Sequence, residues 1–232
     1  MTIKYFPELE QGSEDWLRIR LGLQTASETK LIITPTTLKY ASNDKSRAHM
    51  RQLLAQRITN RIEPSYASDD MIRGHEDEID AKDIYEANIA PVNTVGFITN
   101  NKWGFTLGYS PDGLVGDDGL IEIKSRCPKH QVATIVNNAV PDEYILQLQT
   151  GLLVSEREWI DFISYSNGLP MVVIRVEPDP KTQAAIIEAV TQVEIAIARE
   201  LAVYREQERT NRRLFPTVYK ERQVSLIEEM YA

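Results

Sequence analysis

The sequence has little of what several classes of protein require. It contains one cysteine, Cys127, which excludes an intrachain disulfide and any zinc site with two or more thiolates. No apolar run approaches the roughly 20 residues that a membrane-spanning helix needs. The first residues have neither an apolar stretch nor a small-residue cleavage site, so no signal peptide is predicted. We therefore expect a protein of a reducing cytoplasm, with no membrane partner.

Basic residues are also outnumbered, because 26 Lys and Arg oppose 34 Asp and Glu, for a net charge of −8. Such a balance disfavours nucleic-acid binding, although the distribution of charge matters more than its sum. Residues 1–75 contain 11 basic and 9 acidic residues, whereas residues 76–90 contain six acidic residues and one basic residue. The acidity is therefore local, and carboxylates concentrated in one place can form a metal site.

What is present is typical of a globular protein, with 42% hydrophobic and 26% charged residues over a length that suggests one domain, residues 1–232. Ser27 is expected to cap a short helix, and residues 34–44 are expected to form a polar loop. Gly116 to Gly119 are expected to join strands 104–110 and 119–125 as a hairpin. Residues 181–232 are expected to form a C-terminal helix and tail. The spacing of apolar residues, with capping and turn signals, predicts helices over 14–21, 45–62, 69–89, 131–138 and 143–154, and strands over 95–99, 159–166 and 171–176. This order predicts an α/β (α+β) fold with a mixed central β-sheet flanked by helices.

Two carboxylates and a lysine are expected to meet at one end of this sheet. Glu122 and Lys124 lie two residues apart on a predicted strand, so they project from the same face, while Ile123 points into the core. Asp112 ends the neighbouring predicted strand, and the hairpin can bring it beside Glu122. Asp112, Glu122 and the carbonyl of Ile123 would offer a magnesium ion the oxygen ligands it prefers. Lys124 would orient a metal-bound water and stabilise charge on phosphorus.

The spacing Pro-Asp…Glu-x-Lys is the signature of a large nuclease superfamily, and the acidic helix upstream could complete a second metal position. The alternative interpretation is an Asp-Gly turn beside an exposed strand face. Other polar residues are assigned ordinary roles: a solvated helix face is favoured over a DNA-facing stripe for Arg47, Arg51, Arg57 and Arg61. Glu76, Asp77 and Asp80 are expected to be solvated, Trp103 and Trp159 to be core residues, and the three histidines to bind no metal.

Four blocks together resemble the lambda exonuclease family, also described as the YqaJ-like viral recombinase nucleases. They keep the family's order and similar spacings, and the resemblance is strongest over residues 10–176. The blocks are Glu10-Gln11-Gly12 with Trp16, Arg20-Leu21-Gly22 and Thr25-Ala26-Ser27-Glu28; Gly74-x-x-x-Glu78; Ser110-Pro111-Asp112-Gly113-Leu114 with Glu122-Ile123-Lys124; and Tyr144-x-x-Gln147-x-Gln149.

The resemblance implies a role for individual residues on a restriction-endonuclease-like core. Asp112, Glu122 and Lys124 match the catalytic triad, Glu78 the helix glutamate of the active site, and Gln147 the glutamine beside it. Arg20, Ser27 and Ser110 match a pocket for the 5′ phosphate of the DNA end. Met71 matches the hydrophobic wedge that helps to separate the terminal base pairs, a position where the family carries leucine.

The resemblance also implies a function. Family members are ring-shaped homotrimers that thread duplex DNA, digest one strand from 5′ to 3′ and work with a single-strand annealing protein. We therefore expect a phage- or prophage-encoded exonuclease that releases mononucleotides from double-stranded DNA ends, with two Mg²⁺ ions per site and Mn²⁺ as a substitute. The alternatives are an endonuclease on the same core, a non-catalytic DNA-end-binding protein, and an acidic protein-interaction module.

Overall fold

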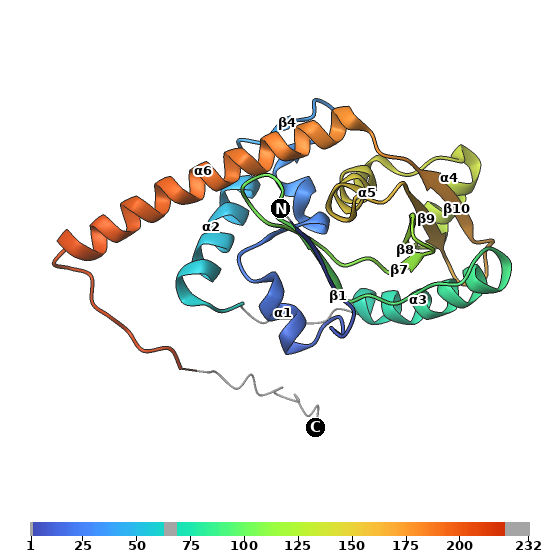
Figure 1. The fold of residues 1–232 in the computed structure, drawn as a ribbon, viewed down its shortest axis with the longest axis horizontal. Helices are drawn as coiled ribbons and strands as arrows, with labels where there is room; N and C mark the ends of the chain where they lie inside the picture. Colours follow the sequence, from blue (N-terminus) through green and yellow to red (C-terminus); the bar gives the residue numbers. More distant parts are fainter. Residues whose placement is uncertain (1, 63–68, 221–232) are drawn as a thin grey trace, which may run out of the picture.

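The computed structural model of the protein describes residues 2–62 and 69–220, and side chains from Arg73 onward in the second range. In chain order, short strands and helices follow one another singly and in groups (Figure 1). The helices are α1 (Glu14–Arg20), the 3₁₀ helix η1 (Ala26–Leu31), α2 (Asp44–Thr59), α3 (Asp69–Asn88), α4 (Pro128–Asn137), α5 (Asp142–Ser155) and α6 (Pro180–Thr210). The strands are β1 (Ile3–Phe6), β2 (Gln24–Thr25), β3 (Ile33–Thr34), β4 (Lys39–Tyr40), β5 (Phe97–Asn100), β6 (Leu107–Tyr109), β7 (Gly113–Val115), β8 (Gly119–Ser125), β9 (Trp159–Tyr165) and β10 (Val172–Val176).

The predicted α/β class with mixed strand directions is confirmed, but the strands form two main sheets. One has the order β1-β5-β6-β2 and the other the order β10-β9-β8-β7, while β3 and β4 pair with each other inside the predicted loop. The pairs β2–β6 and β8–β9 are parallel, and the other pairs are antiparallel. Strand β8 lies between β7 and β9, which explains why its first five residues are all buried.

The sheet that contains β8 is covered on both faces. Alternate residues of a strand point to opposite faces, so Leu120 joins the large core with α5, whereas Ile121 and Ile123 join a smaller cluster. Ala81 and Tyr85 of α3 complete that smaller cluster. The acidic helix therefore lies against one face of the sheet, and α5 lies against the other (Figure 1).

The long helix α6 packs through one apolar stripe and is joined to α2 by ion pairs. Arg57 pairs with Glu194 through two contacts of 2.7 and 2.6 Å, and Arg51 pairs with Glu200 at 3.0 and 3.2 Å. Both arginines are exposed, as the predicted solvated helix face implies, and their ion pairs join α2 to α6. The last turns of α6 extend beyond the body of the molecule (Figure 1). The buried stripe consists of Ile186, Ala189, Val190, Val193 and Ile197.

Two local predictions were wrong. Thr25, not Ser27, occupies the N-cap position of η1, and its side chain makes no capping bond. The hairpin is β7–β8, because β6 ends at Tyr109 and belongs to the other sheet. Pro111 has no N–H for a strand ladder, and the chain leaves the first sheet there. As a result, Asp112 lies in the connection between the two sheets.

Gln149 of α5 holds the connection between β10 and α6. Its amide Nε2 donates to the carbonyl of Glu177 at 2.8 Å, and its Oε1 accepts from the backbone N–H of Asp179 at 2.8 Å. Gln147 lies two residues away, about 200° around the helix, and reaches Glu122 on β8 instead. The two glutamines of one short motif therefore serve different parts of the structure.

We predict that Gln149→Leu lowers the melting temperature by several degrees, since it removes two partly buried hydrogen bonds that hold this connection, at a cost of about 1–3 kcal/mol. The matched control is Gln52→Leu, an exposed glutamine of α2, which should shift the melting temperature much less. Calorimetry or a thermal melt measures both variants. Equal losses would show that Gln149 is no more important to the fold than an exposed glutamine.

Candidate active site

Asp112 is fixed against β8 by its side chain. Its Oδ2 accepts a hydrogen bond from the backbone N–H of Ile123 at 2.5 Å. Asp112 lies in the connection before β7, whereas Ile123 lies within β8. The carbonyl of Pro111 accepts a hydrogen bond from Gln11 Nε2 at 3.2 Å, which ties the same connection to the N-terminal segment. Asp112 therefore lies beside Glu122 as predicted, but through a different turn.

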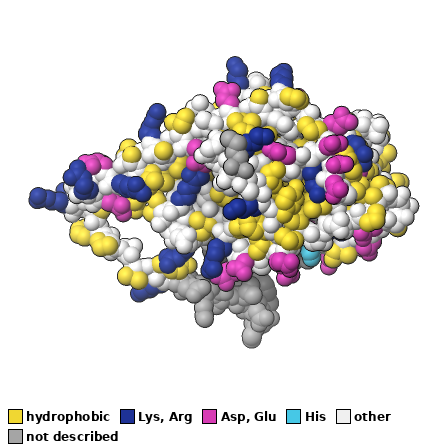
Figure 2. All heavy atoms as spheres, in the orientation of Figure 1, with side chains coloured by type: hydrophobic (Ala, Val, Ile, Leu, Met, Phe, Trp, Pro, Cys, Tyr) yellow, Lys and Arg dark blue, Asp and Glu magenta, His cyan; other side chains and the backbone are white. Residues whose placement is uncertain are grey.

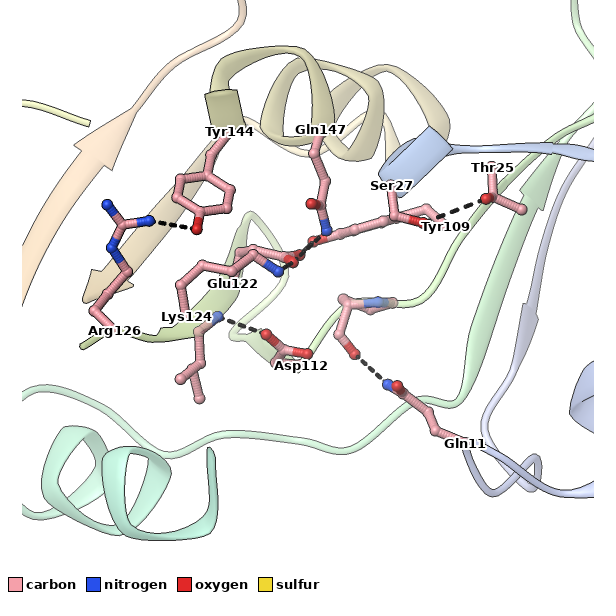
Figure 3. A network of polar contacts seen from close by, with 12 residues as sticks. Gln11, Thr25, Ser27, Tyr109, Asp112, Glu122, Lys124, Arg126, Tyr144 and Gln147 are labelled. Atoms are coloured by element: carbon pink, nitrogen blue, oxygen red, sulfur yellow. Dashed lines mark hydrogen bonds and ion pairs between the residues drawn. The ribbon is translucent and has the colours of Figure 1, made fainter. Parts of the chain in front are cut away.

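Glu122 is only 2% exposed, and both of its carboxylate oxygens have partners (Figure 3). Lys124 Nζ lies 2.6 Å from Oε1, and Gln147 Nε2 donates to the same oxygen. Tyr109, which is itself buried, donates its hydroxyl to Oε2 at 2.8 Å. A buried carboxylate needs such partners, because an unpaired charge in the interior is very costly. Glu122 and Lys124 do project from the same strand face, as the sequence predicts.

The electrostatics of this cluster are dominated by negative charge. Burial, followed by the charges of Glu122 and Glu78, raises the pKa of Asp112 well above its ordinary value. Burial also raises the pKa of Glu78, and Glu122 adds to this while Lys82, His75 and Lys124 oppose it. Burial disfavours the ammonium of Lys124, but the carboxylates of Glu122 and Asp112 outweigh this effect and raise its pKa.

These residues fit a divalent cation by the chemistry of their donors. Three carboxylates share the neighbourhood of one lysine, and hard cations such as Mg²⁺ prefer oxygen ligands. Within residues 2–62 and 69–220, no three His, Cys, Asp or Glu side chains are arranged to hold a metal ion as they stand. The donors would therefore be Asp112 and Glu122, together with the carbonyl of Ile123, and Glu78 would have to move toward them.

The three residues expected to bind a 5′ phosphate are joined by a chain of contacts. Trp16 Nε1 donates to Ser110 Oγ at 2.9 Å. The Arg20 guanidinium lies over the Trp16 ring, 4.1 Å from its centroid, and donates to Thr25 Oγ1 at 3.5 Å. Thr25 Oγ1 in turn lies 3.5 Å from Ser27 Oγ. The structure therefore brings Arg20, Ser27 and Ser110 together, with Ser110 two residues before Asp112.

The positions on α3 have mixed outcomes. Asp77, expected to be solvated, is buried and accepts a hydrogen bond from Ser125 Oγ at 2.5 Å. This contact fixes α3 to the end of β8. Ser125 follows Lys124 on the strand, and Asp77 precedes Glu78 on the helix. Glu78 is close enough to Glu122 for their charges to interact. The side chain of Met71 lies outside the described residues, so the wedge stays a prediction.

Sequence reasoning missed Tyr109, Tyr144 and Arg126. Arg126 Nη1 donates to the hydroxyl of Tyr144 at 2.5 Å and lies 2.7 Å from Glu143. The Tyr144 ring centroid is 5.7 Å from Lys124 Nζ, so this pair forms one side of the cluster in Figure 3. Both tyrosines are visible in the motif blocks, Tyr109 directly before Ser110 and Tyr144 at the start of the glutamine block. Their polar heads beside apolar rings are the signal that could have identified them.

Comparisons with known proteins find exonucleases of similar overall structure. A structure of an alkaline exonuclease (LHK-Exo) from Laribacter hongkongensis has a TM-score of 0.75 and 31% identity, and the match covers 85% of this chain and 98% of that chain. A structure of LHK-Exo in complex with dAMP has the same TM-score and coverage at 33% identity. A phage related exonuclease from Haemophilus somnus 129PT shares the fold at a TM-score of 0.58 and 13% identity, over 78% of this chain and 96% of that chain.

No significant match was found among curated protein sequences. Across the described helices, none is long and apolar enough to cross a membrane. The model of the YqaJ-like viral recombinase domain matches residues 15–158, which include Arg20, Ser27 and the whole Asp112–Glu122–Lys124 cluster. The chain therefore belongs to the YqaJ-like viral recombinase family.

Proposed function

We propose that the protein is a metal-dependent exonuclease that degrades one strand of linear double-stranded DNA from 5′ to 3′ and releases mononucleotides during phage-type recombination by single-strand annealing. Family membership and the likeness to an alkaline exonuclease support a nuclease role in recombination. The observation that carries the proposal is the buried group of Asp112, Glu122 and Lys124 at one sheet end. The dAMP bound to LHK-Exo is a deoxynucleoside monophosphate, the product class that this activity implies.

In this proposal Asp112, Glu122 and the Ile123 carbonyl hold Mg²⁺ or Mn²⁺, and Glu78 contributes to a second ion. The bound metal would lower the pKa of a water molecule and screen the phosphate. Tyr109 and Gln147 keep the Glu122 carboxylate in one orientation, each by a hydrogen bond. Lys124 presents an ammonium group that orients the attacking water and stabilises charge on the phosphate oxygens.

The test is a digest of linear and closed circular duplex DNA with Mg²⁺. We expect loss of the linear substrate only, with mononucleotide products. Asp112→Asn and Glu122→Gln should lose nearly all activity because each removes an anionic ligand, and Lys124→Ala should lose nearly as much although it removes none. The control is Asp117→Asn in the exposed β7–β8 turn, which should keep full activity. Cleavage of closed circles would favour the endonuclease alternative, and an active Asp112→Asn would contradict the assignment.

We further propose that Arg20, Ser27 and Ser110 bind the 5′ phosphate of the DNA end. Trp16 lies beneath the Arg20 guanidinium and donates to Ser110, so one indole ring supports two of the three groups. The guanidinium offers a planar fork of donors that matches a phosphate. A pocket beside Asp112 would fix the scissile bond near the end of the strand and would give the enzyme its direction.

Arg20→Ala should therefore lose most of the preference for 5′-phosphorylated ends over 5′-hydroxyl ends. A charge-assisted hydrogen bond is worth roughly 1.5–3 kcal/mol, which corresponds to about ten- to a hundredfold in rate. The matched control is Arg18→Ala, an exposed arginine on the same helix, which should leave the preference unchanged. Paired rates on the two substrates measure the effect, and an equal slowing of both would rule out Arg20 as the phosphate ligand.

The proposed assembly is a cyclic homotrimer around the duplex, with a single-strand annealing protein as its partner in recombination. A chain of net charge −8 that holds DNA should place its basic residues on an inner surface, and a closed ring achieves this. Light scattering at working concentrations should give about three times the mass of one chain. A stable monomer would contradict the ring.

A further inference from the structure

The last described part of the chain exposes apolar and basic side chains together. We call residues 211–220 the C-terminal tail; it contains three basic residues and no Asp or Glu. Phe215 and Val218 are 80% and 85% exposed, and Leu214 is also exposed. The tail contacts the body through Tyr219, whose ring centroid lies 3.8 Å from the Arg61 guanidinium. Large apolar side chains gathered in one exposed segment are typical of an interaction site.

Helix α3 carries the complementary surface. It contains eight acidic and two basic residues. Glu76, Ile79 and Asp83 are exposed and lie at positions i, i+3 and i+7, so they share one face of the helix. Ala81 and Tyr85 are buried against the sheet on the other face. We call the first set the outer face of α3: an exposed isoleucine between two carboxylates.

This acidic face is unsuited to DNA, because phosphates would be repelled by its carboxylates. It suits a basic segment that also carries an apolar side chain, which describes the tail at Arg212, Arg213 and Phe215. The tail begins at the projecting end of α6, far from α3 (Figure 1), and basic side chains gather around that end (Figure 2). The start of the tail therefore does not reach the outer face of α3 in its own chain.

We propose that the C-terminal tail of one copy docks on the outer face of α3 of a second copy. Contacts between two different surfaces are head to tail, and such contacts generate a closed ring when the rotation between copies closes. The proposal deepens the cyclic assembly proposed above and rests on it. The tail lies beyond residue 158, where the family match ends, whereas α3 lies within the matched range, so this contact would join a segment outside the family domain to a helix inside it.

The docking would leave the candidate active site open. Glu78 lies on the side of α3 that approaches Glu122, about 100° or more around the helix from Ile79 and Asp83. One helix would thus present a carboxylate to the site on one side and hold the neighbouring copy on the other.

The test is charge reversal with compensation, read by light scattering over a dilution series. Arg212→Glu with Arg213→Glu should raise the dissociation constant roughly a hundredfold, because like charges facing each other cost several kcal/mol. Adding Glu76→Lys and Asp83→Lys in the same chain should restore the wild-type mass. The matched control is Lys4→Glu with Lys129→Glu, two exposed lysines elsewhere, which changes the net charge equally. Phe215→Ser should weaken assembly without any change of charge.

An unchanged mass of the Arg212→Glu, Arg213→Glu variant would overturn the proposal. The proposal would also fail if the variant with all four substitutions melts cooperatively but does not regain the wild-type mass. Weaker binding to duplex DNA at unchanged mass would instead assign the tail to nucleic acid. Digestion of linear DNA is measured in parallel. A wild-type chain that is monomeric and still digests linear DNA would contradict the docking and leave the nuclease proposal intact.

Discussion

The site depends on the burial of one carboxylate. Glu122 lies inside a sheet, and its buried carboxylate is compensated there by Tyr109, Gln147 and Lys124, which all reach it. These partners come from β6, α5 and β8, so the two sheets and the helix between them must meet at this point. Gly151 makes the meeting possible, because a Cβ there would lie 2.8 Å from the Tyr109 ring. A change at a glycine far along the chain would therefore disturb the carboxylate.

Helix α3 adds the second constraint. Ala81 and Tyr85 anchor it to the sheet, and the bond from Ser125 to Asp77 fixes its register next to Lys124. This places Glu78 near a cluster that already carries excess negative charge. Burial raises the pKa values of both Asp112 and Glu78, and the charge of Glu122 adds to the rise in each case. Carboxylates that lie close together in a buried site do not stabilise the fold. A bound cation that they coordinate explains why they are placed together.

The sequence predicted those features that follow from local rules. The two-residue period of a strand places Glu122 and Lys124 together, and the acidic run does form one helix. The family resemblance supplied Arg20, Ser27 and Gln147, which no spacing rule identifies. What failed depends on tertiary structure: β6 and β7 belong to different sheets, and Asp77 is buried. Partners that are distant in sequence decided each of these, as they did for Tyr109.

The most direct test of the central claim is the melting temperature of wild type and Asp112→Asn with and without Mg²⁺. The pKa of Asp112 is raised in the folded state, so its ionisation costs stability at pH values above that pKa, and the cost disappears as the pH falls toward the unfolded value. Without metal at alkaline pH, Asp112→Asn should melt at a higher temperature than wild type, and this difference should shrink in acid. Mg²⁺ should raise the melting temperature of wild type well beyond that of the variant. Equal increases in both proteins would contradict a metal site at Asp112.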